Sequence, residues 1–182
     1  MGRKATPQTW IFAYGSLMWN PGFAPAEAVL ATIEGYARSF CMWSIHHRGT
    51  EAEPGLVLAL DTNDGASCAG MAFRLPETGH DAALADLRER ELISSGYYET
   101  VVPLTLGDGR RVEALAYVVA RDHVQYCGGL GVEEQAAIIA RSAGGRGPND
   151  EYLYNTAEHL RGLGIEDKEL TALAARVRAL NA

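Results

Sequence analysis

The sequence predicts an α+β fold in which the strands come first and the helices come last. Short apolar stretches between glycine and proline residues fill about the first hundred positions, and apolar residues at helical spacing fill the C-terminal part. The chain has 182 residues, the size of one domain with one substantial core. We therefore expect a flexible N-terminus over residues 1–8 and a single domain over residues 9–182.

Residues that suit a pleated, partly buried surface form runs between the turn residues of the first part of the chain. These runs predict strands over residues 9–14, 36–44, 56–61, 69–75, 98–106 and 112–119. The Gly107-Asp108-Gly109 segment between the last two runs predicts the tip of a hairpin. One helix, from His80 to about Leu92, is expected to interrupt the strands.

The C-terminal helices are predicted from apolar stripes at helical spacing. The stripe residues are Val132, Ala136, Ile139, Ala140, Ala143, Leu153, Ala157, Leu160, Leu170, Leu173, Ala174 and Val177. Asn149 is expected to cap the middle helix, and the last helix is expected to begin near Asp167. The glycine-rich segment over residues 143–148 is expected to be a flexible loop.

Charge and hydropathy exclude several classes of partner. A net charge of -7 and a pI near 5.2 argue against a nucleic-acid or anionic-membrane surface, because both attract clustered Lys and Arg. Apolar runs all fall short of the roughly 20 residues that span a bilayer. The start of the chain has no apolar stretch before Trp10 that would make a signal peptide, so we expect a cytoplasmic location.

Metal and cofactor sites are not expected. Cys41, Cys68 and Cys127 are widely spaced and are interpreted as reduced thiols. The neighbouring His46 and His47 would point in opposite directions on an extended segment, and no further ligand lies at metal-binding spacing. The glycine pattern of a dinucleotide site is also missing.

A backbone cradle is predicted where the first strand breaks at Tyr14-Gly15-Ser16-Leu17. Glycine leaves no side chain between its amide and a ligand, and successive N–H groups can bind an anion. The alternative interpretation is a strand that ends in a tight turn with a packed leucine. Ser16 is not expected to be a hydrolase nucleophile, since it lacks the G-x-S-x-G context and a recognisable His-Asp pair.

Glu91 is the candidate catalytic carboxylate on helical geometry. Leu84 and Leu87 define the inner face of the helix that starts at His80, and Glu91 follows them at i+7 and i+4, whereas Glu89 is turned away. Desolvation would raise the pKa of an inward carboxyl toward the range useful for proton transfer. A solvated Glu91 beyond the helix end, or one paired with an arginine, remains an alternative.

Several short motifs in a fixed order carry a family resemblance. They are Tyr14-Gly15-Ser16-Leu17, Trp19-Asn20-Pro21, Arg48-Gly49-Thr50, Pro54-Gly55, Arg90-Glu91 and Asn149-Asp150-Glu151-Tyr152-Leu153. With them the chain resembles the ChaC-type γ-glutamylcyclotransferases, the glutathione-degrading branch in particular, from Trp10 to about Leu180. The resemblance implies a small, mostly antiparallel β-barrel with flanking helices.

The resemblance also implies roles for individual residues. Glu91 matches the family's general acid/base, and Tyr14 to Leu17 match the segment that binds the γ-glutamyl group. Tyr152 matches a tyrosine whose hydroxyl is expected to reach the substrate, with an aromatic core residue as the alternative. Arg48 could pair with a peptide carboxylate, but a structural salt bridge or a solvated loop is the favoured interpretation of this residue.

The implied activity is that of a cofactor-free enzyme, a cyclising lyase that converts glutathione to 5-oxoproline and releases cysteinylglycine. The expected partner is thus a small molecule, with neither nucleic acid nor membrane, and the oligomeric state is left open. Two alternatives remain: the same chemistry on other γ-glutamyl amino acids or γ-glutamylamines, and a non-catalytic protein that binds γ-glutamyl peptides. An inward carboxylate at Glu91 argues against the binder, because burying it costs free energy that binding does not need.

Overall fold

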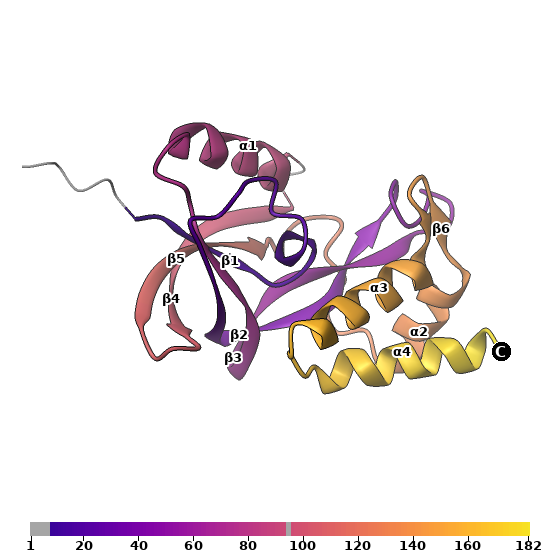
Figure 1. Ribbon diagram of the computed structural model, residues 1–182. Coiled ribbons are helices and arrows are strands. Elements are labelled where there is room, and N and C mark those ends of the chain that lie inside the picture. Colours follow the sequence, from indigo (N-terminus) through magenta and orange to yellow (C-terminus); the bar gives the residue numbers. More distant parts are fainter. Residues whose placement is uncertain (1–7, 94–95) are drawn as a thin grey trace, which may run out of the picture. The chain divides into compact units, whose positions relative to one another are not determined.

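The computed structural model describes residues 8–93 and 96–182, so most of the predicted flexible N-terminus lies outside the described residues (Figure 1). The chain packs as two compact units. The first unit comprises the chain up to Ala37 together with Thr62–Val118, and the second comprises Arg38–Asp61 and Val119–Ala182. Each unit therefore combines segments that are far apart in the sequence, and each is described below by itself.

A closed five-stranded barrel with the strand order β1-β3-β2-β4-β5 confirms the predicted barrel. Its strands are β1 (Trp10–Ala13), β2 (Glu27–Ser44), β3 (Gly55–Arg74), β4 (Tyr97–Leu106) and β5 (Arg111–Val119). β1 pairs antiparallel with β3, with Trp10 opposite Arg74, and parallel with β5, with Trp10 opposite Ala114. Because β1 has a partner on both sides, its four residues are all buried.

Two strands are longer than the sequence predicts. β2 begins at Glu27 rather than at residue 36, and β3 joins the two strands expected over 56–61 and 69–75. The joining segment, residues 62–67, is polar and mostly exposed and belongs to the strand, although Gly65 within it has a left-handed φ of 81°. Exposed strand residues need no apolar alternation, so this part of β3 looks like a turn in the sequence.

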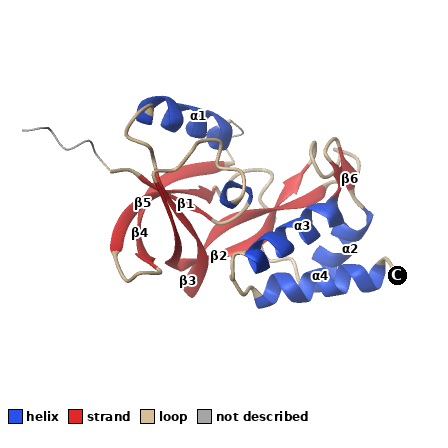
Figure 2. Cartoon of the chain, viewed as in Figure 1, coloured by secondary structure: helices blue, strands red, loops and turns tan. Residues whose placement is uncertain are grey.

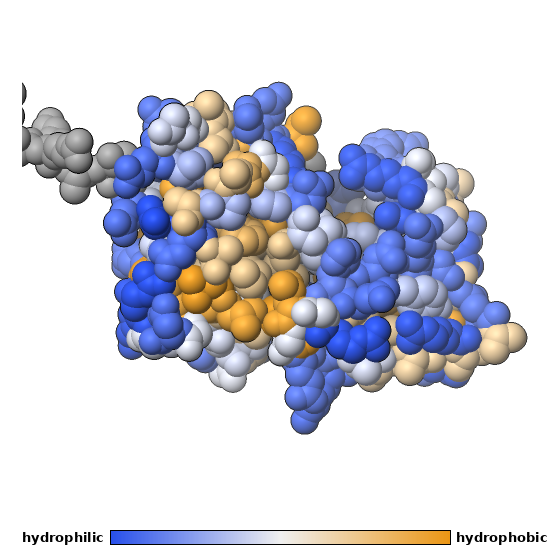
Figure 3. Space-filling view, in the orientation of Figure 1, coloured by the Kyte–Doolittle hydropathy of each residue, from blue (hydrophilic) through white to orange (hydrophobic). Residues whose placement is uncertain are grey.

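Apolar residues also lie on the outer surface of the barrel unit, as Figure 3 shows. Val101 on β4 is 58% exposed and Leu30 on β2 is 42% exposed.

The predicted hairpin tip is confirmed between β4 and β5, where Gly109 donates its N–H to the carbonyl of Leu106 at 2.9 Å and has a φ of 91°. Only glycine adopts such a left-handed φ without strain.

The helix α1 (His80–Leu92) has the predicted bounds and packs against β4 outside the barrel (Figure 1). Leu87 on its inner face is buried. Arg88 on the same helix binds Glu99 of β4 through two hydrogen bonds, of 2.9 and 2.8 Å. Such a two-pronged guanidinium–carboxylate pair fixes the orientation of the helix as well as its distance from the strand.

The second unit is built around three helices, α2 (Val132–Arg141), α3 (Asn149–Gly162) and α4 (Lys168–Leu180), drawn in blue in Figure 2. All three helices contact one another. α4 buries the predicted residues Leu170, Leu173, Ala174 and Val177. The carboxylate of Asp167 caps α4 by accepting the N–H of Leu170 at 2.9 Å, so the predicted start of this helix is confirmed.

Among the described residues, no helix combines the length and apolarity needed to cross a membrane.

Two predictions about the helical part are wrong. Val132 is 49% exposed and Ala143 lies beyond the end of α2, so the buried face consists of Ala136, Ile138 and Ile139. The segment expected to be a flexible loop forms a small hairpin between β6 (Ala143–Gly144) and β7 (Gly147–Pro148). Gly147, with a φ of 108°, supplies the left-handed conformation that this tight turn requires.

Asn149 does not cap α3 as predicted but joins this helix to β3. Its side chain is fully buried and pairs with both backbone groups of Leu56: the Leu56 N–H donates to Oδ1, and Nδ2 donates to the Leu56 carbonyl, each at 2.8 Å. The sequence pattern of a cap and the pattern of a buried bridge are the same, a single Asn before an acidic first turn, so only the fold separates them.

We expect Asn149→Ala to lower the free energy of unfolding by about 2 to 4 kcal/mol, because it leaves a buried donor and a buried acceptor of Leu56 without partners. Urea denaturation followed by circular dichroism measures the change. Asn155→Ala on the exposed face of the same helix is the matched control and should change stability by less than about 0.5 kcal/mol. Equal effects of the two substitutions would contradict the assigned bridge.

Candidate active site

The chain leaves β1 through a short turn that contains the predicted cradle. Ser16–Met18 form a single 3-10 turn, in which the Met18 N–H binds the Gly15 carbonyl at 2.9 Å and the Asn20 N–H binds the Ser16 carbonyl at 2.8 Å. The amides of Gly15, Ser16 and Leu17 come before the first of these bonds and have no acceptor inside the turn. They are the groups that a bound carboxylate or oxyanion could accept from.

Buried side chains hold the cradle turn in place, and free space lies next to Gly15, which is itself buried. The side chains of Tyr14, Leu17 and Met18 are buried, so Leu17 can serve a ligand only through its backbone. A Cβ atom placed on Gly15 would meet no protein atom within 4 Å. The space over Gly15 is therefore unoccupied by protein, as a site that admits a ligand close to the backbone requires.

Glu91 lies in the last turn of α1 with its side chain only 16% exposed, which confirms the predicted inward orientation. Glu89 on the same helix is exposed. Burial raises the pKa of the Glu91 carboxyl above its usual range, and the nearby Arg90 charge offsets part of that rise. A carboxyl with a raised pKa can accept a proton and give it back near neutral pH.

Arg90 connects Glu91 to the cradle. Its Nη1 donates to the Asn20 carbonyl at 2.7 Å, its Nη2 donates to the Ser16 hydroxyl oxygen at 3.4 Å, and its Nε lies 3.5 Å from Oε1 of Glu91. The predicted site residues of the barrel unit are thus brought together. Sequence reasoning paired Arg90 with Glu91 only as part of a motif; a contact between positions 70 residues apart, as Arg90 and Asn20 are, leaves no local signal.

The pKa of a second carboxyl group in the barrel unit, Glu99, is shifted in the opposite direction to that of Glu91. Glu99 accepts hydrogen bonds from Arg88 and from the buried Tyr117 hydroxyl, the latter at 2.9 Å, and the Arg88 bonds lower its pKa. Burial, together with the bond to Glu99, raises the pKa of Tyr117. The pKa values of the two carboxyl groups are therefore shifted in opposite directions, that of Glu99 downward and that of Glu91 upward.

The second unit brings together the two remaining predicted residues, Arg48 and Tyr152. The Arg48 guanidinium carbon lies 5.5 Å from the centre of the Tyr152 ring, and Nη1 donates to the Pro148 carbonyl at 3.1 Å. The Tyr152 hydroxyl accepts the Leu58 N–H at 3.3 Å, and Phe40 packs edge-on against its ring. Both side chains therefore have structural contacts of their own in this unit.

Metal-binding and reactive-thiol chemistry find no support in the described part of the chain. No group of three or more His, Cys, Asp or Glu side chains there is arranged to hold a metal ion. All the cysteines are free, and burial raises the pKa of Cys41 to about 11 and of Cys127 to about 12. Thiols with such pKa values are poor nucleophiles at neutral pH.

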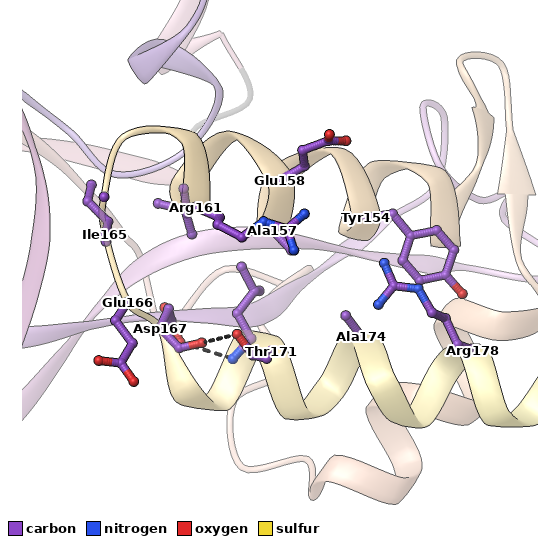
Figure 4. A pocket seen from close by; sticks show the side chains of 13 residues that line it. Tyr154, Ala157, Glu158, Arg161, Ile165, Glu166, Asp167, Thr171, Ala174 and Arg178 are labelled. Atoms are coloured by element: carbon purple, nitrogen blue, oxygen red, sulfur yellow. Dashed lines mark hydrogen bonds between the residues drawn. The ribbon is translucent and has the colours of Figure 1, made fainter.

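A surface hollow of about 520 Å³ lies between α3 and α4 (Figure 4). Arg178 covers the Tyr154 ring at 4.6 Å on one side of it, and Asp167 caps α4 on the other. The seven predicted site residues are all absent from its lining. We interpret it as the crevice between two amphipathic helices rather than as the reaction site.

Comparisons with known proteins find relatives over nearly the whole chain. The model of the family described as ChaC-like protein matches residues 9–180. A relative from Escherichia coli (strain K12), named glutathione-specific gamma-glutamylcyclotransferase, is 38% identical over 171 residues, which cover 94% of this chain and 73% of that protein. A human relative, named glutathione-specific gamma-glutamylcyclotransferase 1, is 32% identical over 172 residues, 92% of this chain and 78% of that protein.

A solved structure shares the fold over almost its full length. The crystal structure of a selenomethionine-labelled gamma-glutamyl cyclotransferase specific to glutathione, from yeast, superposes with a TM-score of 0.84 at 25% identity, covering 94% of this chain and 96% of that one. The family match extends over nearly the whole chain and, with the relatives' identity over the same length, shows that the chain belongs to the ChaC-like protein family.

Proposed function

We propose that this protein cyclises the γ-glutamyl group of glutathione to 5-oxoproline and releases cysteinylglycine. The observation that carries the proposal is a buried carboxyl of raised pKa, Glu91, which Arg90 connects to the open cradle at Gly15–Leu17. The names of the bacterial, human and yeast relatives support glutathione as the substrate.

In the proposed reaction the substrate supplies its own nucleophile. Glu91 takes a proton from the α-ammonium group, and the free amine attacks the γ-carbonyl carbon to close a five-membered ring. The protonated Glu91 then gives its proton to the departing nitrogen of cysteinylglycine as the C–N bond breaks. The ring nitrogen, which still carries one extra proton after the attack, releases it to the freed amine, so that the products are a neutral lactam and the ammonium form of cysteinylglycine. One carboxyl serves as base and then as acid, which contributes about 10² to 10⁴-fold to the rate. Holding the amine against its own carbonyl contributes more, because it can lower the activation barrier by about 7 to 11 kcal/mol.

The cradle stabilises the charges of this reaction. The carbonyl oxygen becomes an oxyanion during ring closure, and the α-carboxylate of the glutamyl group is negative throughout. The amides of Gly15, Ser16 and Leu17 are the proposed donors to these oxygens, and Tyr14 fixes the start of the turn from the core. A preorganised donor to an oxyanion is typically worth about 3 to 4 kcal/mol.

The roles of Arg48 and Tyr152 belong to the same proposal but rest on the family pattern. Their contacts hold the start of α3 against β3 and the loop that follows β2. We propose that they assist substrate binding while serving this structural purpose. A cytoplasmic location stays a prediction. The choice of glutathione over other γ-glutamyl compounds rests on the names of the relatives.

We expect Glu91→Gln to fold normally and to lose at least about 10²-fold in turnover, because the amide has nearly the same shape but cannot exchange protons. Formation of 5-oxoproline from glutathione measures turnover, and circular dichroism checks the fold. Glu89→Gln, two residues away and exposed, is the control and should retain its activity. Near-normal turnover of a folded Glu91→Gln protein would show that the catalytic group lies elsewhere.

Gly15→Val should abolish turnover without a large loss of stability. The new side chain would meet no protein atom at its Cβ position but would fill the space in which the substrate must approach the amides. Ser16→Ala leaves the backbone amide in place and should be milder. Complete loss of activity in Ser16→Ala, together with an acyl group trapped on Ser16 of the unaltered protein, would favour a serine nucleophile instead.

The identity of the nucleophile can be tested with the substrate itself. Because the α-amine attacks in the proposed reaction, N-acetylglutathione should not be turned over at any concentration. In ¹⁸O-labelled water, 5-oxoproline formed by internal attack should carry no label. A hydrolase would instead cleave the acetylated compound and place one label in the γ-carboxylate of glutamate. Labelled glutamate as the first product would rule out cyclisation, whatever the sequence relatives are named.

A further inference from the structure

The guanidinium of Arg90 has more contacts than an ion-pair partner of Glu91 needs. It donates to the Asn20 carbonyl and to the Ser16 hydroxyl oxygen, and its Nε faces the Glu91 carboxylate. It also lies beside Gly22, where φ is 81° and an added Cβ would be 3.8 Å from Nη1. The turn that carries the cradle therefore curves around this side chain.

The contacts join two segments that carry different parts of the proposed reaction. Ser16 and Asn20 belong to the turn after β1, whereas Glu91 belongs to the last turn of α1. The three acceptors, a backbone carbonyl, a hydroxyl and a carboxylate, are each near a different nitrogen of the guanidinium. The planar guanidinium holds these donors apart in fixed directions, whereas lysine carries its three donors on a single nitrogen and would have to draw all three acceptors around it.

We propose that Arg90 is a positioning residue that holds the cradle turn and the Glu91 carboxylate in one fixed geometry. The inference rests on the proposed role of Glu91. Arg90 does not touch the reacting atoms in this proposal; it sets the separation and angle between the proton carrier and the backbone donors. A misplacement of about 1 Å in such a constellation can cost about 10²-fold in rate.

The charge of Arg90 gives the proposal a second readout. Among the residues that the structure describes, the titratable or charged groups that interact electrostatically with Glu91 are Arg90 on its own helix and Tyr117 on β5. The Tyr117 hydroxyl stays neutral at acidic and neutral pH, since its pKa is raised, and it is already bonded to Glu99. Removing the Arg90 charge therefore leaves burial to act on Glu91 with less compensation, which favours the protonated carboxyl.

The test compares Arg90→Gln and Arg90→Lys with the unaltered full chain. For each protein, kcat and KM for glutathione are measured across the pH range, and circular dichroism with urea denaturation records the fold and stability. Arg110→Gln is the charge-matched control, because Arg110 belongs to the same unit and binds Glu27 and Asp108 rather than Glu91. Glu91→Gln is measured alongside as the test of the proposed function itself.

For Arg90→Gln we expect a folded protein whose kcat is at least about tenfold lower and whose acidic limb of kcat/KM lies at higher pH. Arg90→Lys keeps the positive charge but loses the planar guanidinium. We therefore expect its acidic limb to stay near that of the unaltered protein, while its kcat remains at least about fivefold below that of the unaltered protein. Arg110→Gln should move neither kcat nor the acidic limb, whatever stability it loses.

Two results would overturn the inference. A kcat of Arg90→Lys equal to that of the unaltered protein would show that the charge alone matters and that the guanidinium geometry does not position the cradle turn or Glu91. Normal kcat and an unmoved acidic limb in Arg90→Gln would show that Arg90 contributes to stability only. Failure of the proposed function has a different signature, a folded Glu91→Gln protein with normal turnover, so the two failures are told apart by separate variants.

Discussion

The pairing of β1 on both of its edges is the constraint on which the candidate site depends. β1 has only four residues, Trp10–Ala13, yet it bonds antiparallel to β3 and parallel to β5 and thereby closes the barrel. A shift of this strand by one residue would exchange the side chains of its two faces, both of which are buried and packed, and would break the pairing on both edges. The place where the chain leaves the barrel, and hence the place of the Gly15 turn, is fixed by that register.

The second constraint is electrostatic and divides the two carboxylates of the barrel unit. Both Glu91 and Glu99 are partly withdrawn from water, but Glu99 receives two bonds from Arg88 and one from Tyr117, whereas Glu91 has the Arg90 charge at 3.5 Å. Hydrogen bonds outweigh desolvation for Glu99, and desolvation outweighs the single charge for Glu91. The direction of each pKa shift thus follows from the number of donors that each carboxylate receives.

The sequence predicts the local part of this arrangement well. The bounds of α1, the buried stripe of α4 and the inward orientation of Glu91 all follow from helical periodicity, and the structure confirms them. Periodicity fails where the deciding contact is distant. It missed the exposed middle of β3, whose polar residues resemble a turn, and it gave Asn149 the role of a cap. The Arg90–Asn20 bond belongs to the same class, because nothing near either residue in the sequence indicates the other.

The same limit explains why family motifs need a physical interpretation residue by residue. In the Asn-x-x-Tyr segment, both side chains reach the backbone of β3: Asn149 pairs with Leu56, and the Tyr152 hydroxyl accepts the N–H of Leu58. Two residues one helical turn apart thus bind alternate residues of one strand, which is sufficient reason for that spacing even without a ligand. Glu91 differs from both, because its carboxylate lies 3.5 Å from the Arg90 guanidinium and burial still raises its pKa. Withdrawing a carboxylate from water costs free energy, which a single charge contact offsets only in part, and the catalytic role proposed for Glu91 would account for that cost.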